Sequence, residues 1–226
     1  MLKDVAIAGA TGLVGRALAD QLAADPRGGA LHLLLRRPQP ALQALPRATA
    51  ITWQGSGTMP ALPAVDTGLC ALGTTIRTAG SEEAFRAVDF DAVVAFAQAC
   101  RHSGATRFGL VSALGADARS GIFYNRVKGE AEEAVAALGF ERLVIARPSL
   151  LLGDRQALGQ PRRPGEAAAQ ALAPMIGWMI PRRLRPIPAE SVAAGLIAAL
   201  SQPGPRIQQV ESDELTRLGS QAARQA

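Results

Sequence analysis

Short apolar segments alternate with longer alanine-rich amphipathic segments along the first 150 residues of the chain. The short segments are rich in Val, Ile and Leu, which predicts strands, and the longer ones carry apolar residues three and four positions apart, which predicts helices. Strands that alternate with helices are typical of a parallel sheet with helices on both faces. The pattern therefore predicts an α/β fold, a Rossmann-type doubly wound parallel sheet of about six to seven strands.

The boundaries of these elements follow from turn residues and helix stops. Strands are predicted at Val5–Ala8, Leu31–Leu35, Ala50–Trp53, Thr67–Leu72, Arg107–Ser112, Arg142–Ala146 and Ile207–Glu211. Helices are predicted at Leu13–Ala24, Ser81–His102, Ile122–Leu138, Glu190–Leu200 and Asp213–Leu218. A further short helix is expected between Pro38 and Pro63.

The pattern changes between residues 153 and 188, where prolines interrupt every candidate element. We predict a single NAD(P)-binding domain over residues 1–226, within which 153–188 form a small C-terminal substrate lobe or lid. An apolar piece, Ala171–Ile180, is followed by arginines at 182, 183 and 185. Three interpretations of 171–185 stay open: a lid, a buried core segment, or a surface for a partner.

Composition narrows the classes of function. Apolar residues make up 48% of the 226 residues and charged residues 19%, as in an ordinary globular protein. The net charge is +5, but no run of five or six like charges indicates a nucleic-acid-binding arm. Two cysteines in apolar segments and two separate histidines do not suggest a metal site. With Asp4 and a glycine turn interrupting any leader-like stretch, we expect a cytoplasmic protein without an integral membrane segment.

The strongest local motif is the turn Gly9-Ala10-Thr11-Gly12-Leu13-Val14-Gly15, between the first predicted strand and the first helix. In a dinucleotide-binding turn the first glycine allows the tight turn, the second lets the pyrophosphate approach the backbone, and the third lets the helix pack on the sheet. The positive end of the helix then holds the phosphate charge. A glycine-rich turn without a ligand is the alternative, but the strand–turn–helix context favours nucleotide binding.

The second predicted strand ends at Leu35 and is followed by Arg36 and Arg37, where an acid that binds the ribose hydroxyls would favour NAD. Two guanidinium groups suit a 2′-phosphate, which they can bind by charge and paired hydrogen bonds. The sequence therefore favours NADP(H) over NAD(H). In the alternative, one arginine lies at the solvated edge and the other stacks on adenine.

Three polar residues form the candidate catalytic group: Ser112 at the end of the fifth strand, then Tyr124 and Lys128 on the next helix. Residues four apart share a helix face, so Tyr124 and Lys128 should point together toward the carboxyl edge of the sheet. A nearby ammonium favours the phenolate of Tyr124, whose ordinary pKa of about 10 is too high for acid–base work at neutral pH. Ser112 can donate a hydrogen bond to a developing oxyanion. The alternative is an ordinary helix tyrosine and a solvated lysine, but Tyr124 is the only tyrosine of the chain.

These motifs together resemble the short-chain dehydrogenase/reductase superfamily in its atypical or extended branch. The segments that resemble its Tat-interacting-protein-like oxidoreductase subgroup are Cys70–Thr75, Tyr124–Glu130, Arg147–Arg155 and Arg163–Glu166. The resemblance implies that Leu72, Gly73 and Thr74 line the cofactor and that Pro148 lies beside the nicotinamide. Two positions depart from the superfamily pattern: Asp89 replaces an asparagine that is frequent in extended relatives, and Trp53-Gln54 replaces an adenine-binding aspartate.

Two functions from different classes follow. The first is an NADP(H)-dependent oxidoreductase of a small, apolar carbonyl or alcohol substrate, in which Tyr124 is the acid–base, Lys128 tunes it and Ser112 stabilises the oxyanion. The second is an NADPH-binding regulatory or redox-sensing module with little turnover that presents a protein-interaction surface. A sugar-nucleotide epimerase or dehydratase is disfavoured because 226 residues leave little room for a large substrate domain. The sequence leaves open a homodimer or a complex with another protein.

Overall fold

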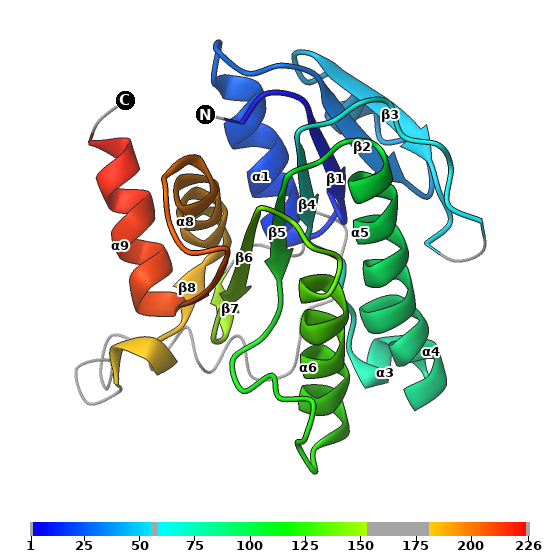
Figure 1. Cartoon of the computed structure of the whole chain (residues 1–226), viewed down its shortest axis with the longest axis vertical. Helices are drawn as coiled ribbons and strands as arrows, with labels where there is room; N and C mark the ends of the chain where they lie inside the picture. Colours follow the sequence, from blue (N-terminus) through cyan, green and yellow to red (C-terminus); the bar gives the residue numbers. More distant parts are fainter. Residues whose placement is uncertain (1, 56–57, 153–180, 225–226) are drawn as a thin grey trace.

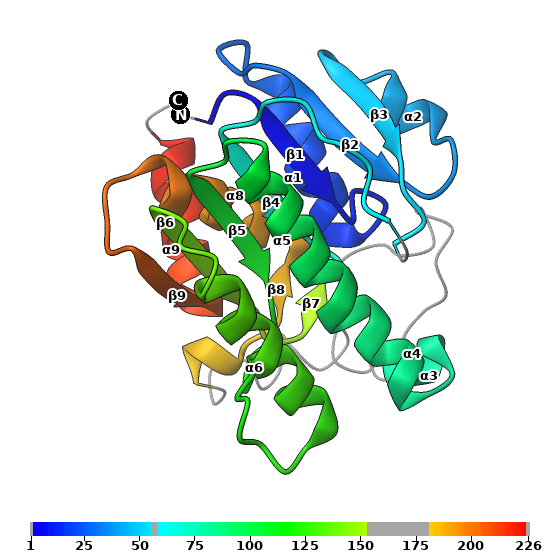
Figure 2. The ribbon, with the colours of Figure 1, turned by 45° about the vertical axis from the view of Figure 1, so that its right-hand side comes forward.

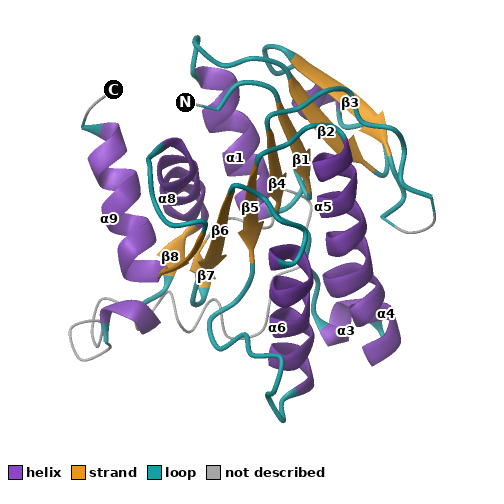
Figure 3. Ribbon diagram, in the orientation of Figure 1, coloured by secondary structure: helices purple, strands orange, loops and turns teal. Residues whose placement is uncertain are grey.

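The computed structural model describes residues 2–55, 58–152 and 181–224. Its centre is a seven-stranded sheet of order β3-β2-β1-β4-β5-β6-β9, in which every neighbouring pair is parallel. Helices cover both faces, so that the sheet is the middle of three layers (Figure 1, Figure 3). The predicted fold class, a Rossmann-type α/β sheet, is confirmed.

The strands are β1 Val5–Ala8, β2 Leu31–Leu35, β3 Ala48–Thr52, β4 Thr67–Cys70, β5 Arg107–Val111, β6 Arg142–Arg147 and β9 Ile207–Glu211. The helices are α1 Leu13–Ala24, α2 Pro40–Gln43, α3 Ile76–Ala79, α4 Glu82–Arg86, α5 Ala92–His102, α6 Phe123–Ala136, α8 Ala189–Ser201 and α9 Ser212–Ala223. A π-helical turn, η1 Ala87–Asp91, and a 3-10 turn, η2 Arg182–Leu184, complete them, together with a small parallel pair, β7 Leu151–Leu152 and β8 Ile187–Pro188.

The central strands β1 and β4 are buried along their whole length because helices cover both faces of the sheet. On β1, Val5 and Ile7 point into the layer formed with α1, α8 and α9, whereas Ala6 and Ala8 point into the layer formed with α5 and α6. Figure 2 shows α5 and α6 side by side in front of the sheet. Because the apolar cores occupy both faces, polar groups that act on a ligand must come from the edges of the sheet.

The prediction of one continuous α-helix over residues 81–102 is wrong in one respect. The helix begins as α4 with Ser81 as its N-cap, whose hydroxyl accepts from the Ala84 N–H, but it then widens into η1 before α5 begins. A π-turn inserts one extra residue into the helix and shifts the faces that follow it. Asp89 is thereby buried, although an acid within a helix usually lies on the solvated face.

Other differences lie at the ends of elements. The helix predicted at Asp213–Leu218 extends to Ala223, and the pair β7–β8 was not predicted from sequence, because its strands are only two residues long. Ala171–Ile180 and most of the predicted lobe at 153–188 lie outside the described residues. The lobe therefore stays a prediction.

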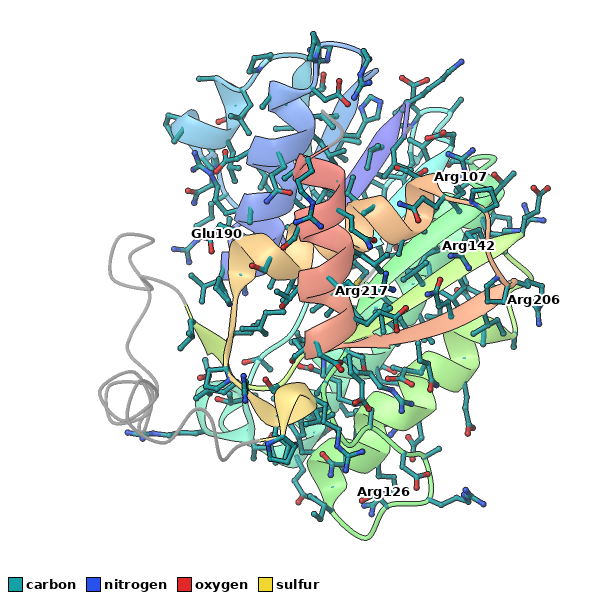
Figure 4. All side chains as sticks on the ribbon, turned by 90° about the vertical axis from the view of Figure 1, so that its left-hand side faces the viewer. Arg107, Arg126, Arg142, Glu190, Arg206 and Arg217 are labelled. Atoms are coloured by element: carbon teal, nitrogen blue, oxygen red, sulfur yellow. The ribbon has the colours of Figure 1, made fainter. Side chains whose placement is uncertain are left out.

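The last strand and the helices α8 and α9 are held by one buried arginine and one close helix contact. Arg142, at the start of β6, donates from Nη2 to the Ala199 carbonyl at 3.0 Å, and it also hydrogen-bonds to the Pro205 carbonyl and the Gln208 side chain. Figure 4 shows Arg142 close to Arg206, at the edge of the sheet where β5, β6 and β9 begin. Where α8 packs on α9, a Cβ on Gly195 would lie 2.4 Å from the Leu215 carbonyl oxygen. The backbones of the two helices are therefore in direct contact.

We predict that Gly195→Ala lowers the free energy of unfolding by about 1–3 kcal/mol, because the added methyl must push α9 away from α8. Chemical denaturation of both proteins measures this loss. Gly121→Ala is the matched control, since a Cβ at Gly121 meets nothing within 4 Å. Equal stability of Gly195→Ala and the wild type would contradict the close packing of α8 on α9.

Candidate cofactor and active site

The glycine turn is built by close backbone approaches that only glycine allows. Gly9 has φ +86°, and a Cβ there would lie 2.5 Å from the backbone of Ala71, the residue after β4. A Cβ on Gly15 would lie 2.0 Å from the Gly9 carbonyl oxygen. These two glycines bring α1 and the loop after β4 against the end of β1, as the sequence predicted.

The middle glycine has open space above it. A Cβ on Gly12 would meet only the Gly9 carbonyl oxygen, at 3.4 Å, and the Gly12 N–H donates to that same oxygen at 3.0 Å. Gly12 is also the N-cap of the 12-residue helix α1, whose end carries no side-chain cap. Ala10, Leu13 and Val14 are buried beneath the turn. A diphosphate therefore fits this turn, where the backbone is approachable and the helix end is positive.

Arg36 and Arg37 follow β2 at the same edge of the sheet, and both are exposed. The Arg36 carbonyl accepts from the side-chain amide of Gln54 at 3.3 Å, which connects the segments that follow β2 and β3. Trp53, in the position where superfamily relatives have an acid, is buried in the core of the α5 face. Gln54 and the two arginines are therefore polar groups at the carboxyl ends of β3 and β2.

The residues that the resemblance assigns to the cofactor lie in the loops after β4 and β6. Leu72 is partly buried against the core, and Gly73 and Thr74 continue the loop toward α3. Pro148 is buried directly after β6, and its carbonyl accepts from the Leu114 N–H at 3.0 Å. All four residues thus lie at the carboxyl edge of the sheet, where the glycine turn also lies.

Ser112, Lys128 and Asp89 line one small hollow between β5, α6 and η1, together with Val93, Leu110, Val111 and Ala131. Ser112 is 8% exposed, and its Oγ has no hydrogen-bond partner among the described residues. A buried hydroxyl without a partner costs stability, and such groups are rare in folded proteins. The Ser112 hydroxyl is therefore a candidate hydrogen-bond donor to a ligand at this edge of the sheet.

Tyr124 and Lys128 lie one turn apart on α6, as predicted from their spacing. The Tyr124 ring packs on Phe85 with 5.4 Å between ring centroids, and its side chain is partly buried. Lys128 is buried, and its Nζ lies 2.7 Å from Oδ1 of Asp89. Burial opposes the charge of Lys128, but Asp89, Tyr124 and the hydrogen bond to Asp89 outweigh it, so the pKa of Lys128 is raised.

Sequence reasoning missed two buried acids in this region. It named Asp89 only as a departure from the superfamily pattern, and it did not single out Glu132, one turn after Lys128. Glu132 is buried and accepts from Nε of Arg147 at 3.0 Å, which joins α6 to the end of β6. The available signal was the i, i+4, i+8 spacing of Tyr124, Lys128 and Glu132 on one face of the predicted helix.

Comparison with known proteins places this geometry in a family. A family profile described as NAD(P)H-binding matches residues 9–203, which include the glycine turn, Ser112, Tyr124 and Lys128. The chain belongs to this NAD(P)H-binding family, among the atypical short-chain dehydrogenase/reductases. The superfamily predicted from sequence is thereby confirmed.

Two curated relatives and one solved structure illustrate the assignment. The protein fmp52, mitochondrial, of Emericella nidulans is 37% identical over 185 residues, which cover 78% of this chain and 77% of the relative. The protein HTATIP2 of Rattus norvegicus is 44% identical over 111 residues, 49% of this chain and 44% of the relative. The structure of MoeE5 in complex with UDP-glucose and NAD superposes with a TM-score of 0.68 at 15% identity and covers 98% of this chain and 82% of that one.

The same relatives correct the cytoplasmic prediction. Fmp52 proteins of Emericella nidulans and Aspergillus fumigatus, 37% and 36% identical over 78% of this chain, are named as mitochondrial proteins. The prediction rested on the absence of a recognisable leader, and it is contradicted by these close relatives. Among the described residues, no helix is long and apolar enough to cross a membrane.

We predict that Ser112→Ala leaves the free energy of unfolding unchanged or raises it, because the variant removes a buried hydroxyl that has no partner. Thermal and chemical denaturation measure the effect. The matched control is Ser212→Ala, because Ser212 is also buried but its Oγ accepts from the Ser149 N–H at 2.9 Å. This control should lose about 1–2 kcal/mol. A comparable loss in both variants would show that the Ser112 hydroxyl is used by the fold.

Proposed function

We propose that this protein is an NADP(H)-dependent oxidoreductase that reduces a small, apolar carbonyl compound or oxidises the corresponding alcohol. The observation that carries the proposal is the buried Ser112 hydroxyl, which has no partner among the residues that the structure describes and lines the same hollow as Lys128. It stands at the carboxyl edge of a parallel sheet, beside a glycine turn that a diphosphate fits.

The residues divide the chemistry as follows. NADPH, when bound, supplies a hydride to the carbonyl carbon, and the carbonyl oxygen then needs a proton. Ser112 donates a hydrogen bond to that oxygen while its negative charge develops. Tyr124 gives its hydroxyl proton to the oxygen, so that the product is the neutral alcohol and the phenolate is re-protonated from solvent. Lys128 holds the cofactor ribose and stabilises the phenolate by its positive charge.

An apolar substrate is supported by the side chains around this edge. Ile76, Ile122, Leu150 and Leu184 are the large apolar side chains that are at least 37% exposed among the described residues, and Ile122 is 63% exposed. Ile76 begins α3 after β4, Ile122 lies between β5 and α6, and Leu150 follows β6, so these three belong to segments that follow the carboxyl ends of strands. Exposed apolar groups gathered near polar ones are typical of small-molecule sites.

The preference for NADP(H) is proposed from Arg36 and Arg37, which are exposed beside the predicted adenosine end of the cofactor. We predict that NADPH at about 100 times its Kd stabilises the protein by about 2.7 kcal/mol, which is roughly 5–10 °C in Tm. NADH should give a smaller shift, and Arg36→Ala/Arg37→Ala should reduce the NADPH shift to the NADH value. A thermal-shift titration with both nucleotides measures these differences.

The matched control for this charge removal is Arg101→Ala/Arg206→Ala. Both residues are exposed, and they lie at the opposite edge, at the end of α5 and just before β9. This variant loses the same net charge and should keep the full NADPH shift. Equal shifts with NADPH and NADH in the wild type would contradict the preference, and no shift with either would contradict the proposed function.

We predict that Tyr124→Phe lowers kcat/KM for NADPH-dependent carbonyl reduction by about 100-fold or more, because the variant lacks the donated proton. A panel of apolar aldehydes and ketones, followed by NADPH absorbance, provides the measurement. The NADPH thermal shift should survive in the variant, since the ring and its packing on Phe85 remain. Binding of NADPH without turnover of any carbonyl in the wild type would instead favour the regulatory-module hypothesis.

A further inference from the structure

Asp89 is a fully buried carboxylate that the proposed chemistry does not use. It has no solvent exposure and lies in η1, between α4 and α5. Single π-turns within helices are frequent at functional sites, because the extra residue redirects a side chain. The residue thus carries a charge in the core at a place where the helix geometry is unusual.

The two oxygens of Asp89 contact two different parts of the site. Oδ1 lies 2.7 Å from Nζ of Lys128 on α6. Oδ2 accepts from the Thr74 N–H, in the loop after β4, at 2.8 Å. One side chain therefore joins the lysine to the loop that the superfamily resemblance places beside the cofactor.

Gly73, in the loop after β4, brings the backbone of that loop close to the ion pair of Asp89 and Lys128. A Cβ on Gly73 would lie 3.4 Å from Oδ1 of Asp89 and 3.5 Å from Nζ of Lys128. The Gly73 backbone therefore covers the ion pair directly. A buried ion pair of this kind costs desolvation that an apolar pair of equal volume would avoid, so its presence at this position favours a role beyond stability.

We propose that Asp89 is a positioning residue of the site: its carboxylate fixes both the Lys128 ammonium and the Thr74 amide, so that the lysine and the cofactor loop are held in one arrangement. This inference rests on the proposed function, because the value of the arrangement lies in placing Lys128 between the cofactor and Tyr124. In this role the negative charge of Asp89 holds the Lys128 ammonium, which an uncharged asparagine at the same position would not do.

The arrangement determines how Lys128 titrates. The titratable groups near its ammonium are Asp89 from η1, Tyr124 from α6 and Cys70 from β4. Burial raises the pKa of Cys70 to about 12, so its thiol stays neutral at working pH. An ammonium has three donor hydrogens, so while Lys128 stays charged it can bind Asp89 and still donate to the cofactor and to Tyr124.

The chain permits a direct test because it has only two lysines, Lys3 and Lys128. NMR of protein labelled with ¹³C at the lysine ε-carbon follows both titrations in one spectrum, with exposed Lys3 as the internal reference. In the wild type, Lys128 should titrate above Lys3. In Asp89→Asn, the amide oxygen can still accept from the Thr74 N–H, but the amide NH₂ then faces the Lys128 ammonium. No negative charge then offsets the lowering of the Lys128 pKa by burial.

We predict that Asp89→Asn lowers the titration midpoint of Lys128 by about one pH unit or more. The control is Asp91→Asn, an exposed aspartate in the same π-turn, which should leave the midpoint unchanged. An unchanged Lys128 midpoint in Asp89→Asn would overturn the proposal. If Asp89→Asn does not fold, the wild-type spectrum tests the proposal by itself. A Lys128 that titrates below Lys3 in the wild type also overturns the proposal.

The Kd for NADPH gives the second readout. In Asp89→Asn it should rise more at about pH 9.5 than at neutral pH, because Lys128 loses its proton there. Lys128→Met should weaken binding by the same factor at both pH values. The same loss at both pH values in Asp89→Asn would assign Asp89 a purely structural role and overturn the proposal. Failure of the wild type to bind NADPH refutes the proposed function, whereas the lysine titration tests Asp89 without any cofactor.

Discussion

The burial of both faces of a parallel sheet is the constraint on which the rest of this structure depends. The central strands present apolar side chains alternately to the α1–α8–α9 layer and to the α5–α6 layer, so most of each face is apolar core. The loops that leave the carboxyl ends of β1, β4, β5 and β6 are then the segments that can carry a site. The glycine turn, Thr74, Ser112 and Pro148 belong to these loops.

Close backbone contact at the centre of the sheet determines how these loops meet. Gly9 and Gly15 remove the side chains that would separate β1, α1 and the Ala71 backbone, so the loop after β4 lies directly beside the turn. On the other side, the Leu114 N–H donates to the Pro148 carbonyl at 3.0 Å, which joins the loops after β5 and β6. The candidate cofactor turn and the candidate catalytic residues thus lie at the same edge of the sheet.

The charged side chains near this edge of the sheet form ion pairs. Buried Lys128 faces Asp89, and partly buried Arg147 faces Glu132, so both of these cations have a buried carboxylate partner. Ser112 is the exception, because its buried hydroxyl has no partner in the described part of the chain. The contrast between paired charges and one unpaired hydroxyl distinguishes groups that organise the site from a group that is available to a ligand.

Sequence by itself determined the α/β class, the bounds of β1, α1 and β2, the glycine turn, and the placement of Tyr124 and Lys128 on one helix face. These features depend on local periodicity, on turn chemistry and on spacing along one helix, and each of these depends only on residues that are close in the sequence. Only the tertiary structure decided that Asp89 is buried in a π-turn and bridges Lys128 and Thr74. That outcome depends on contacts among residues 15 and 39 positions apart in the chain, and on a helix distortion that periodicity does not encode.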